Sequence, residues 1–112
     1  MTDQLHYLAA VPFEAACQIP ILPAGHRSRR LHGHGFLARA RAALPAGWAP
    51  FPGGDCDAFT AALNAAVAPL DYQYLNDQLR VPTDENLARW VRGRLEVPGL
   101  VTVGVRSTPD TG

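Results

Sequence analysis

Two histidines separated by one residue, His32 and His34, are the part of this 112-residue sequence that most clearly indicates chemistry. On a β-strand their side chains would project from the same face, because successive strand residues point to opposite faces. Two imidazoles on one face could bind one divalent ion, and zinc is commonly held by imidazole and thiolate ligands. The same pair could instead be hydrogen-bonded surface or core residues.

A zinc site would need a third ligand, and the sequence offers Cys17 and His26. Either would complete a set of three protein ligands and leave the fourth tetrahedral position open for water or substrate, as in catalytic zinc sites. Cys17 could equally be an inert buried thiol. The residues therefore indicate a zinc site around His32 and His34 and leave the third ligand open.

Three segments have the composition of strands that could position these residues. Residues 5–17 are apolar and aromatic, although Pro12 favours an edge strand or a bulge because proline cannot donate a ladder hydrogen bond. Residues 31–44 alternate with a period of two, with the histidines on one face and arginines on the other, although the alanine-rich stretch from Phe36 onward could also be helical. Residues 100–105 are rich in β-branched residues and predict a closing strand.

Two amphipathic helices are predicted between the second and third of these segments. The first follows Asp55 or Asp57, either of which could cap it, and its apolar stripe extends to Leu70. The second has Thr83 as its N-cap residue and ends before Pro98. Acidic residues follow Thr83 in the first turn, where they meet the positive end of the helix dipole.

The composition is that of one small domain spanning residues 1–112. Ten Lys and Arg balance ten Asp and Glu, so no net charge attracts nucleic acid or an anionic membrane. No apolar run approaches the roughly 18 residues that span a bilayer, and the first residues do not resemble a signal peptide. Two cysteines are too few for a disulfide scaffold. We expect a cytoplasmic protein without a nucleic-acid or membrane partner.

Short motifs along most of the chain resemble the 6-pyruvoyl- and 6-carboxytetrahydropterin synthase family, whose 6-carboxy branch serves queuosine biosynthesis. Each motif is short, but the shared order and similar spacing are hard to obtain by chance. The matching pieces are Phe13–Cys17, Gly25–His26, Arg30–His34, Asp55, Leu70–Asp71, Tyr74–Asp77, Pro82–Thr83 with Glu85–Ala88, and Arg106–Thr108.

The resemblance implies an α+β tunnelling fold (T-fold), in which an antiparallel four-stranded sheet has two helices packed on one face. It further implies that the subunits form a homo-oligomer, expected to be a hexamer, with sites at subunit interfaces. The family's cofactor is Zn²⁺ and its reaction is a lyase reaction on dihydroneopterin triphosphate. On this resemblance the metal ligands are Cys17, His32 and His34.

Several functional positions of the family carry other residues here. The first zinc histidine is replaced by Cys17, the catalytic cysteine by Ser28, the proton-transferring histidine after Asp71 by Tyr72, and the ring-anchoring glutamate by Ser107. A serine hydroxyl is a weak base without an adjacent group that takes its proton. A tyrosine with a pKa of about 10 is a poor proton shuttle near pH 7.

We therefore expect a zinc-dependent lyase acting on dihydroneopterin triphosphate or a related pterin-like heterocycle, with altered catalytic residues. The catalytic candidates are Asp71, Tyr72 and Ser28, and the substrate-binding candidates are Ser107, Thr108 and Arg27. The guanidinium of Arg27 could hold phosphate oxygens or simply be solvated. The alternative is a catalytically inactive or repurposed member that acts as a binding or assembly subunit.

Overall fold

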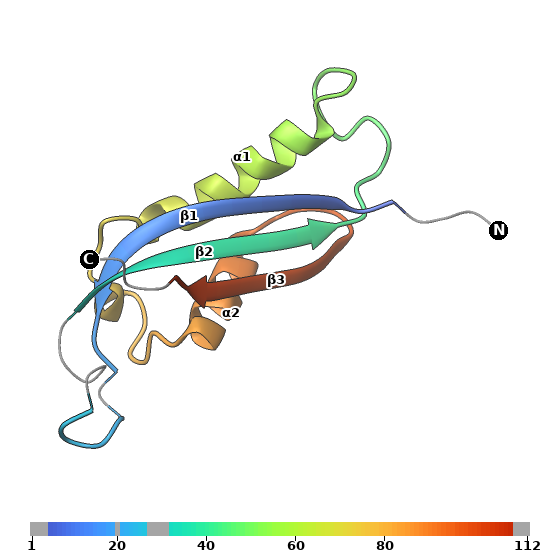
Figure 1. Ribbon diagram of the computed structural model, residues 1–112. Coiled ribbons are helices and arrows are strands. Elements are labelled where there is room, and N and C mark those ends of the chain that lie inside the picture. Colours follow the sequence, from blue (N-terminus) through green and yellow to red (C-terminus); the bar gives the residue numbers. More distant parts are fainter. Residues whose placement is uncertain (1–4, 20, 27–31, 109–112) are drawn as a thin grey trace.

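The computed structural model describes residues 5–19, 21–26 and 32–108, and only the backbone of His32 (Figure 1). Two single-turn 3₁₀ helices, Ala68–Leu70 and Leu75–Asp77, lie between the two α-helices. The main elements in chain order are β1 (Tyr7–Cys17), β2 (His32–Ala42), α1 (Asp55–Val67), α2 (Asp84–Arg94) and β3 (Leu100–Ser107).

The strands form one antiparallel sheet in the order β1-β2-β3. The ladder between β1 and β2 is uninterrupted from Tyr7 opposite Ala42 to Cys17 opposite His32. The ladder between β2 and β3 has one irregularity near the end of β2. Within the described chain β1 is an edge strand, which accommodates Pro12 as its composition predicted.

The four strands implied by the family resemblance are only three in the described residues. The periodicity of the chain itself predicted three, close to their observed bounds. The connection from β2 to α1 adds no strand, because residues 45–54 hold three prolines and three glycines. Prolines cannot donate ladder hydrogen bonds, and Gly47 and Gly53 adopt positive φ angles of 74° and 81°, which reverse the chain.

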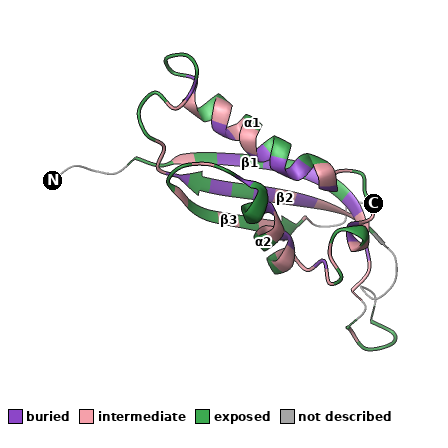
Figure 2. Ribbon diagram, turned by 180° about the vertical axis from the view of Figure 1, so that it is seen from behind, coloured by how far each residue is buried: buried purple, intermediate pink, exposed green. Residues whose placement is uncertain are grey.

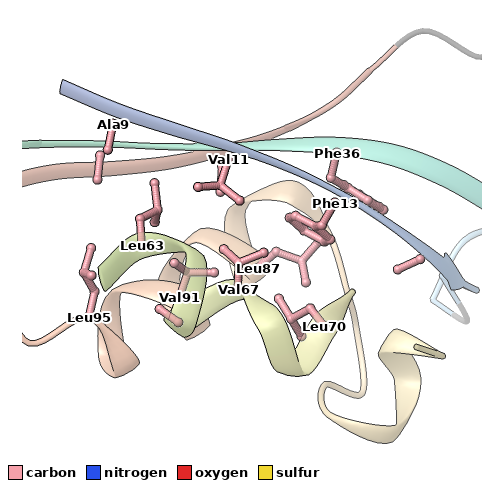
Figure 3. Close-up of a cluster of buried hydrophobic side chains, with 14 of the residues drawn as sticks. Ala9, Val11, Phe13, Phe36, Leu63, Val67, Leu70, Leu87, Val91 and Leu95 are labelled. Atoms are coloured by element: carbon pink, nitrogen blue, oxygen red, sulfur yellow. The ribbon is translucent and has the colours of Figure 1, made fainter. Parts of the chain in front are cut away.

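Both helices cover the same face of the sheet, with α1 against β1 and α2 against β3 (Figures 1 and 2). On β2 the buried positions include Ala38, Ala40 and Ala42, whose small side chains leave room for the helices. The predicted two-residue period of β2 is confirmed, because the arginines between these alanines are exposed. Larger side chains fill the core, including Val11, Phe13, Leu63, Val67, Leu70, Leu87 and Val91 (Figure 3).

The starts of the two helices differ from each other. Thr83 Oγ1 accepts a hydrogen bond at 3.2 Å from the backbone N–H three residues later, so it caps α2 as predicted. Neither Asp55 nor Asp57 caps α1 with its side chain, so that prediction is wrong. The Asp55 carboxylate instead accepts a hydrogen bond from the Ala49 N–H at 2.7 Å and holds the preceding connection. No helix in the described residues is long and apolar enough to cross a membrane.

Candidate metal and substrate site

A pocket of about 220 Å³ lies at one end of the sheet, beside the first turn of α2. Three of its residues, Cys17, His34 and Ser107, were predicted as site residues from the sequence. The structure therefore brings together two predicted metal ligands and one predicted substrate contact. The residues that line the pocket are Cys17, Ile19, Leu22, His34, Phe36, Pro82, Thr83, Asp84 and Ser107.

Cys17 reaches the pocket because it is the last residue of β1 and shares the buried face of that strand with Phe13 and Ala15. It is only 2% exposed. Burial, and to a lesser extent the negative charge of Asp84, raise the pKa of the Cys17 thiol. Both effects disfavour the thiolate, so the thiol stays protonated at neutral pH unless a cation binds next to it.

His34 lies on β2, on the strand face that packs toward the core. The register places Cys17 directly opposite His32, and residues diagonal to such a pair are also neighbours on one face of a sheet. The His34 and Phe36 rings are 5.7 Å apart and tilted by 52°. Phe36 in turn stacks on Phe13 with 5.0 Å between ring centroids. The aromatic wall of the pocket is thus continuous with the core.

The donors at this end of the sheet fit a zinc ion in their chemistry. A thiol and an imidazole line one pocket, and the backbone of His32 lies opposite Cys17. Among the side chains that the structure describes, no three of His, Cys, Asp or Glu form a group that could hold a metal ion, and the side chain of His32 is outside that set. The alternative ligand His26 lies in a turn and is not among the lining residues.

The end of β1 is fixed by a segment that follows α1. The side-chain oxygen of Asn76 accepts a hydrogen bond from the Gln18 N–H at 2.8 Å, and its side-chain nitrogen donates to the Gln18 carbonyl at 3.0 Å. The Ala16 N–H donates to the Gln73 carbonyl at 3.0 Å. These bonds hold the backbone on both sides of Cys17. From the sequence Asn76 was only part of a matching motif, because its partner lies 58 residues away.

Asp84 is a carboxylate in the pocket wall that the sequence indicated only as a residue of the first helical turn. One oxygen accepts a hydrogen bond from the Ser107 hydroxyl at 2.6 Å, and the other accepts one from the Ser107 N–H at 2.9 Å. The two residues are 23 positions apart and belong to α2 and β3. No local pattern could pair them, although the position of Thr83 as a cap indicated where the helix begins.

The predicted catalytic pair lies outside this pocket. The Asp71 carboxylate accepts a hydrogen bond from the Glu14 N–H at 3.0 Å, and the Tyr72 N–H donates to the Glu14 carbonyl at 2.6 Å. Tyr72 has a left-handed φ of 56° and is 79% exposed. Within the described chain, the proposed metal ligands and the proton-transfer candidates therefore do not form one site.

The remaining predicted substrate contacts are placed only in part. Thr108 follows β3, and its N–H donates to the Gly35 carbonyl at 2.8 Å, next to Ser107 but not in the pocket wall. The Thr108 hydroxyl occupies the space that a side chain on Gly35 would need, so a larger residue there would force the Thr108 side chain to rotate. Arg27 and Ser28 lie outside the described residues, and their roles stay predictions.

Comparison with known proteins identifies the family of this chain. Residues 6–110 match the 6-pyruvoyl tetrahydropterin synthase family, and the chain belongs to that family. It is 39% identical over 106 residues to the 6-carboxy-5,6,7,8-tetrahydropterin synthase of Synechocystis sp., covering 86% of this chain and 81% of that protein. The 6-pyruvoyl tetrahydropterin synthase of Caenorhabditis elegans matches its fold with a TM-score of 0.69 at 16% identity, over 94% of this chain and 89% of that one. The expected T-fold is thereby confirmed.

Proposed function

We propose that this protein is a zinc-dependent lyase of the 6-pyruvoyl/6-carboxytetrahydropterin synthase type. Its substrate would be dihydroneopterin triphosphate or a related pterin-like heterocycle. The observation that carries the proposal is the convergence of Cys17, His34 and Ser107 on one pocket. Family membership and the synthase activity named for the Synechocystis relative support the class of reaction.

Cys17, His32 and His34 would hold the metal ion. This set of one sulfur and two nitrogen ligands leaves one tetrahedral position open for water or substrate. Bound zinc would supply Lewis acidity toward a substrate oxygen. Because burial keeps the Cys17 thiol protonated, zinc binding would release its proton. A thiolate in place of the family's histidine also makes the site less positive and a weaker Lewis acid.

Asp71 and Tyr72 would serve the pocket of a second copy of the chain. They do not line the pocket of their own chain, and Tyr72 is 79% exposed. Sites at the interfaces of a homo-oligomer, expected to be a hexamer, would bring them to a neighbouring pocket. There the Tyr72 hydroxyl could donate a hydrogen bond to the substrate. Ser28 and Arg27 remain candidates for the position of the base and for a phosphate contact.

Metal analysis tests the ligand set without relying on activity. Mass spectrometry of the purified protein should find close to one zinc per chain, and Cys17→Ala should lose most of it. Cys56→Ala is the matched control, because Cys56 is an exposed cysteine outside the pocket. Unchanged zinc content in Cys17→Ala, or a wild type that takes up no zinc, would contradict the metal site.

Turnover of dihydroneopterin triphosphate tests the reaction itself. The zinc-loaded wild type should convert this substrate or a closely related pterin. If only the triple variant Ser28→Cys, Tyr72→His and Ser107→Glu is active, the natural protein has lost or changed the family's reaction. That result would favour the inactive or repurposed subunit over the lyase.

A further inference from the structure

We propose that Asp84 anchors the ring of the substrate in this pocket. Its carboxylate would accept hydrogen bonds from an amidine-like edge, in which a ring N–H lies next to an exocyclic amino group, as in a 2-amino-4-oxopyrimidine. The inference rests on the proposed function, because it concerns the substrate of the same site. The inference assigns a binding role to Asp84, which the sequence analysis had treated only as part of a helix start.

The carboxylate of Asp84 is held at both oxygens by one residue. The hydroxyl and the N–H of Ser107 donate to it at 2.6 Å and 2.9 Å. A carboxylate can accept about four hydrogen bonds, so about two positions remain for a ligand. Asp84 is the one carboxylate among the described residues that line the pocket. Paired N–H donors of a ligand would therefore bind at Asp84.

The rest of the pocket wall suits a flat heterocycle. Ile19, Leu22, Phe36 and Pro82 supply apolar surface, and Phe36 is backed by the stacked ring of Phe13 at 5.0 Å. The volume of about 220 Å³ is below the roughly 300–1,000 Å³ of sites for drug-sized ligands. The pocket thus suits a small ring system, and a phosphate chain would extend out of it.

Asp84 could instead serve only to join β3 to α2 and to favour the start of the helix. Its neighbour Glu85 separates a role in ligand binding from a contribution to the helix start. Glu85 belongs to the same helical turn and carries the same charge, but it is exposed and pairs with Arg89 at 2.8 Å. Both side chains lie where the helix dipole favours negative charge, whereas only Asp84 lines the pocket. A role confined to the helix would make the two residues equivalent.

Binding of 6,7-dimethylpterin and 6,7-dimethyllumazine to the purified, zinc-analysed protein tests the proposal. The lumazine has a carbonyl group in place of the 2-amino group, so the wild type should bind the pterin more tightly. Asp84→Asn should weaken pterin binding about 10- to 100-fold, as expected for a lost charge-assisted hydrogen bond, and should change lumazine binding little. Ser107→Ala keeps the carboxylate and should cost only a few-fold. Glu85→Gln should bind both probes as the wild type does.

Several results would overturn the proposal: a wild type with no preference for the pterin, wild-type binding by Asp84→Asn, or loss of zinc together with pterin in Asp84→Asn. If Asp84→Asn melts well below the wild type, Asp84→Glu decides, because a restored carboxylate must restore the preference. A retained pterin preference in a protein without zinc or turnover would instead reject the proposed lyase and leave the anchoring role standing.

Discussion

The two helices lie on the same face of the sheet, but different interactions hold them. α2 buries only Leu87 and Val91, and its first turn is polar, with Thr83 as cap and Asp84 bonded to Ser107. α1 begins without a side-chain cap and buries four apolar side chains: Phe59, Leu63, Ala66 and Val67. The comparison shows that the pocket is built on the less apolar helix, whose first turn presents polar groups to a ligand.

The largest effect is expected from Phe59→Ala, which removes the main buried side chain of α1. Phe59 is 0% exposed, and truncation of such a core phenylalanine destabilises by about 3–5 kcal/mol because it leaves a cavity. Urea unfolding measures the change. Phe51→Ala is the control, since Phe51 is 55% exposed and should change stability by about 0.5 kcal/mol. Similar losses in both variants would mean that burial is not what holds α1.

A smaller effect is expected from Thr83→Ala on α2. Loss of a threonine cap costs about 1 kcal/mol, because an N–H of the first turn loses its acceptor. The matched control is Thr60→Ala in α1, where the Thr60 hydroxyl donates to the Cys56 carbonyl at 3.0 Å within the helix. That substitution should be neutral or slightly stabilising, since alanine is the better helix former. Equal destabilisation in urea would remove the difference between the helices.

The stability of the protein should depend on pH through Cys17 in the pocket, whose pKa is affected by Asp84 of α2. Burial and Asp84 raise the pKa of Cys17 in the folded state, so this contribution to stability is complete below the unfolded pKa of about 8.5. It is lost as the pH rises through the folded pKa. In chelator-treated protein, the urea midpoint of the wild type should therefore fall more between pH 8 and pH 10 than that of Cys17→Ser. Parallel curves would contradict the shift.

The smallest effect is expected from breaking the ion pair between Glu85 and Arg89. The pair spans one helical turn at 2.8 Å, but both side chains are more than 70% exposed, at 73% and 72%. Solvent screens such pairs, so Glu85→Gln should cost about 0.3–0.5 kcal/mol at low salt and less in 1 M NaCl. A loss comparable to that of Thr83→Ala would show that this exposed face of α2 matters more than its cap.

The elements that carry the site could be predicted from the sequence where a pattern of neighbouring residues indicates the structure. Alternation along β2 placed His34 on the same face as Phe36 and the alanines, and the structure packs that face toward the core. The cap at Thr83 was equally visible, because its partner lies three residues away. Periods and caps are local properties, so a single sequence carries them.

Contacts between distant segments could not be predicted in this way. Neither Asp84 nor Ser107 indicates the other in the sequence, and only the packing of α2 beside β3 pairs them. Asn76 bonds to the end of β1 from a 3₁₀ helix of a single turn, which is too short to show a periodic pattern. Asp55 is a residue type that often caps helices, but its carboxylate accepts a hydrogen bond at 2.7 Å from a backbone N–H of the loop before α1. The fourth strand was expected from the family and not from the residues.

The unbroken ladder between β1 and β2 ties the pocket to the length of β1 as well as to its residues. Ala9 and Cys17 face the same side because they are an even number of positions apart, and no bulge in that ladder could absorb a change. Deleting one residue between them would rotate Cys17 onto the outer face or withdraw Ala9 from the core. A substitution in β1 thus affects only the position that it changes. A single insertion or deletion would instead move several side chains to the other face of the sheet and disrupt the core or the pocket.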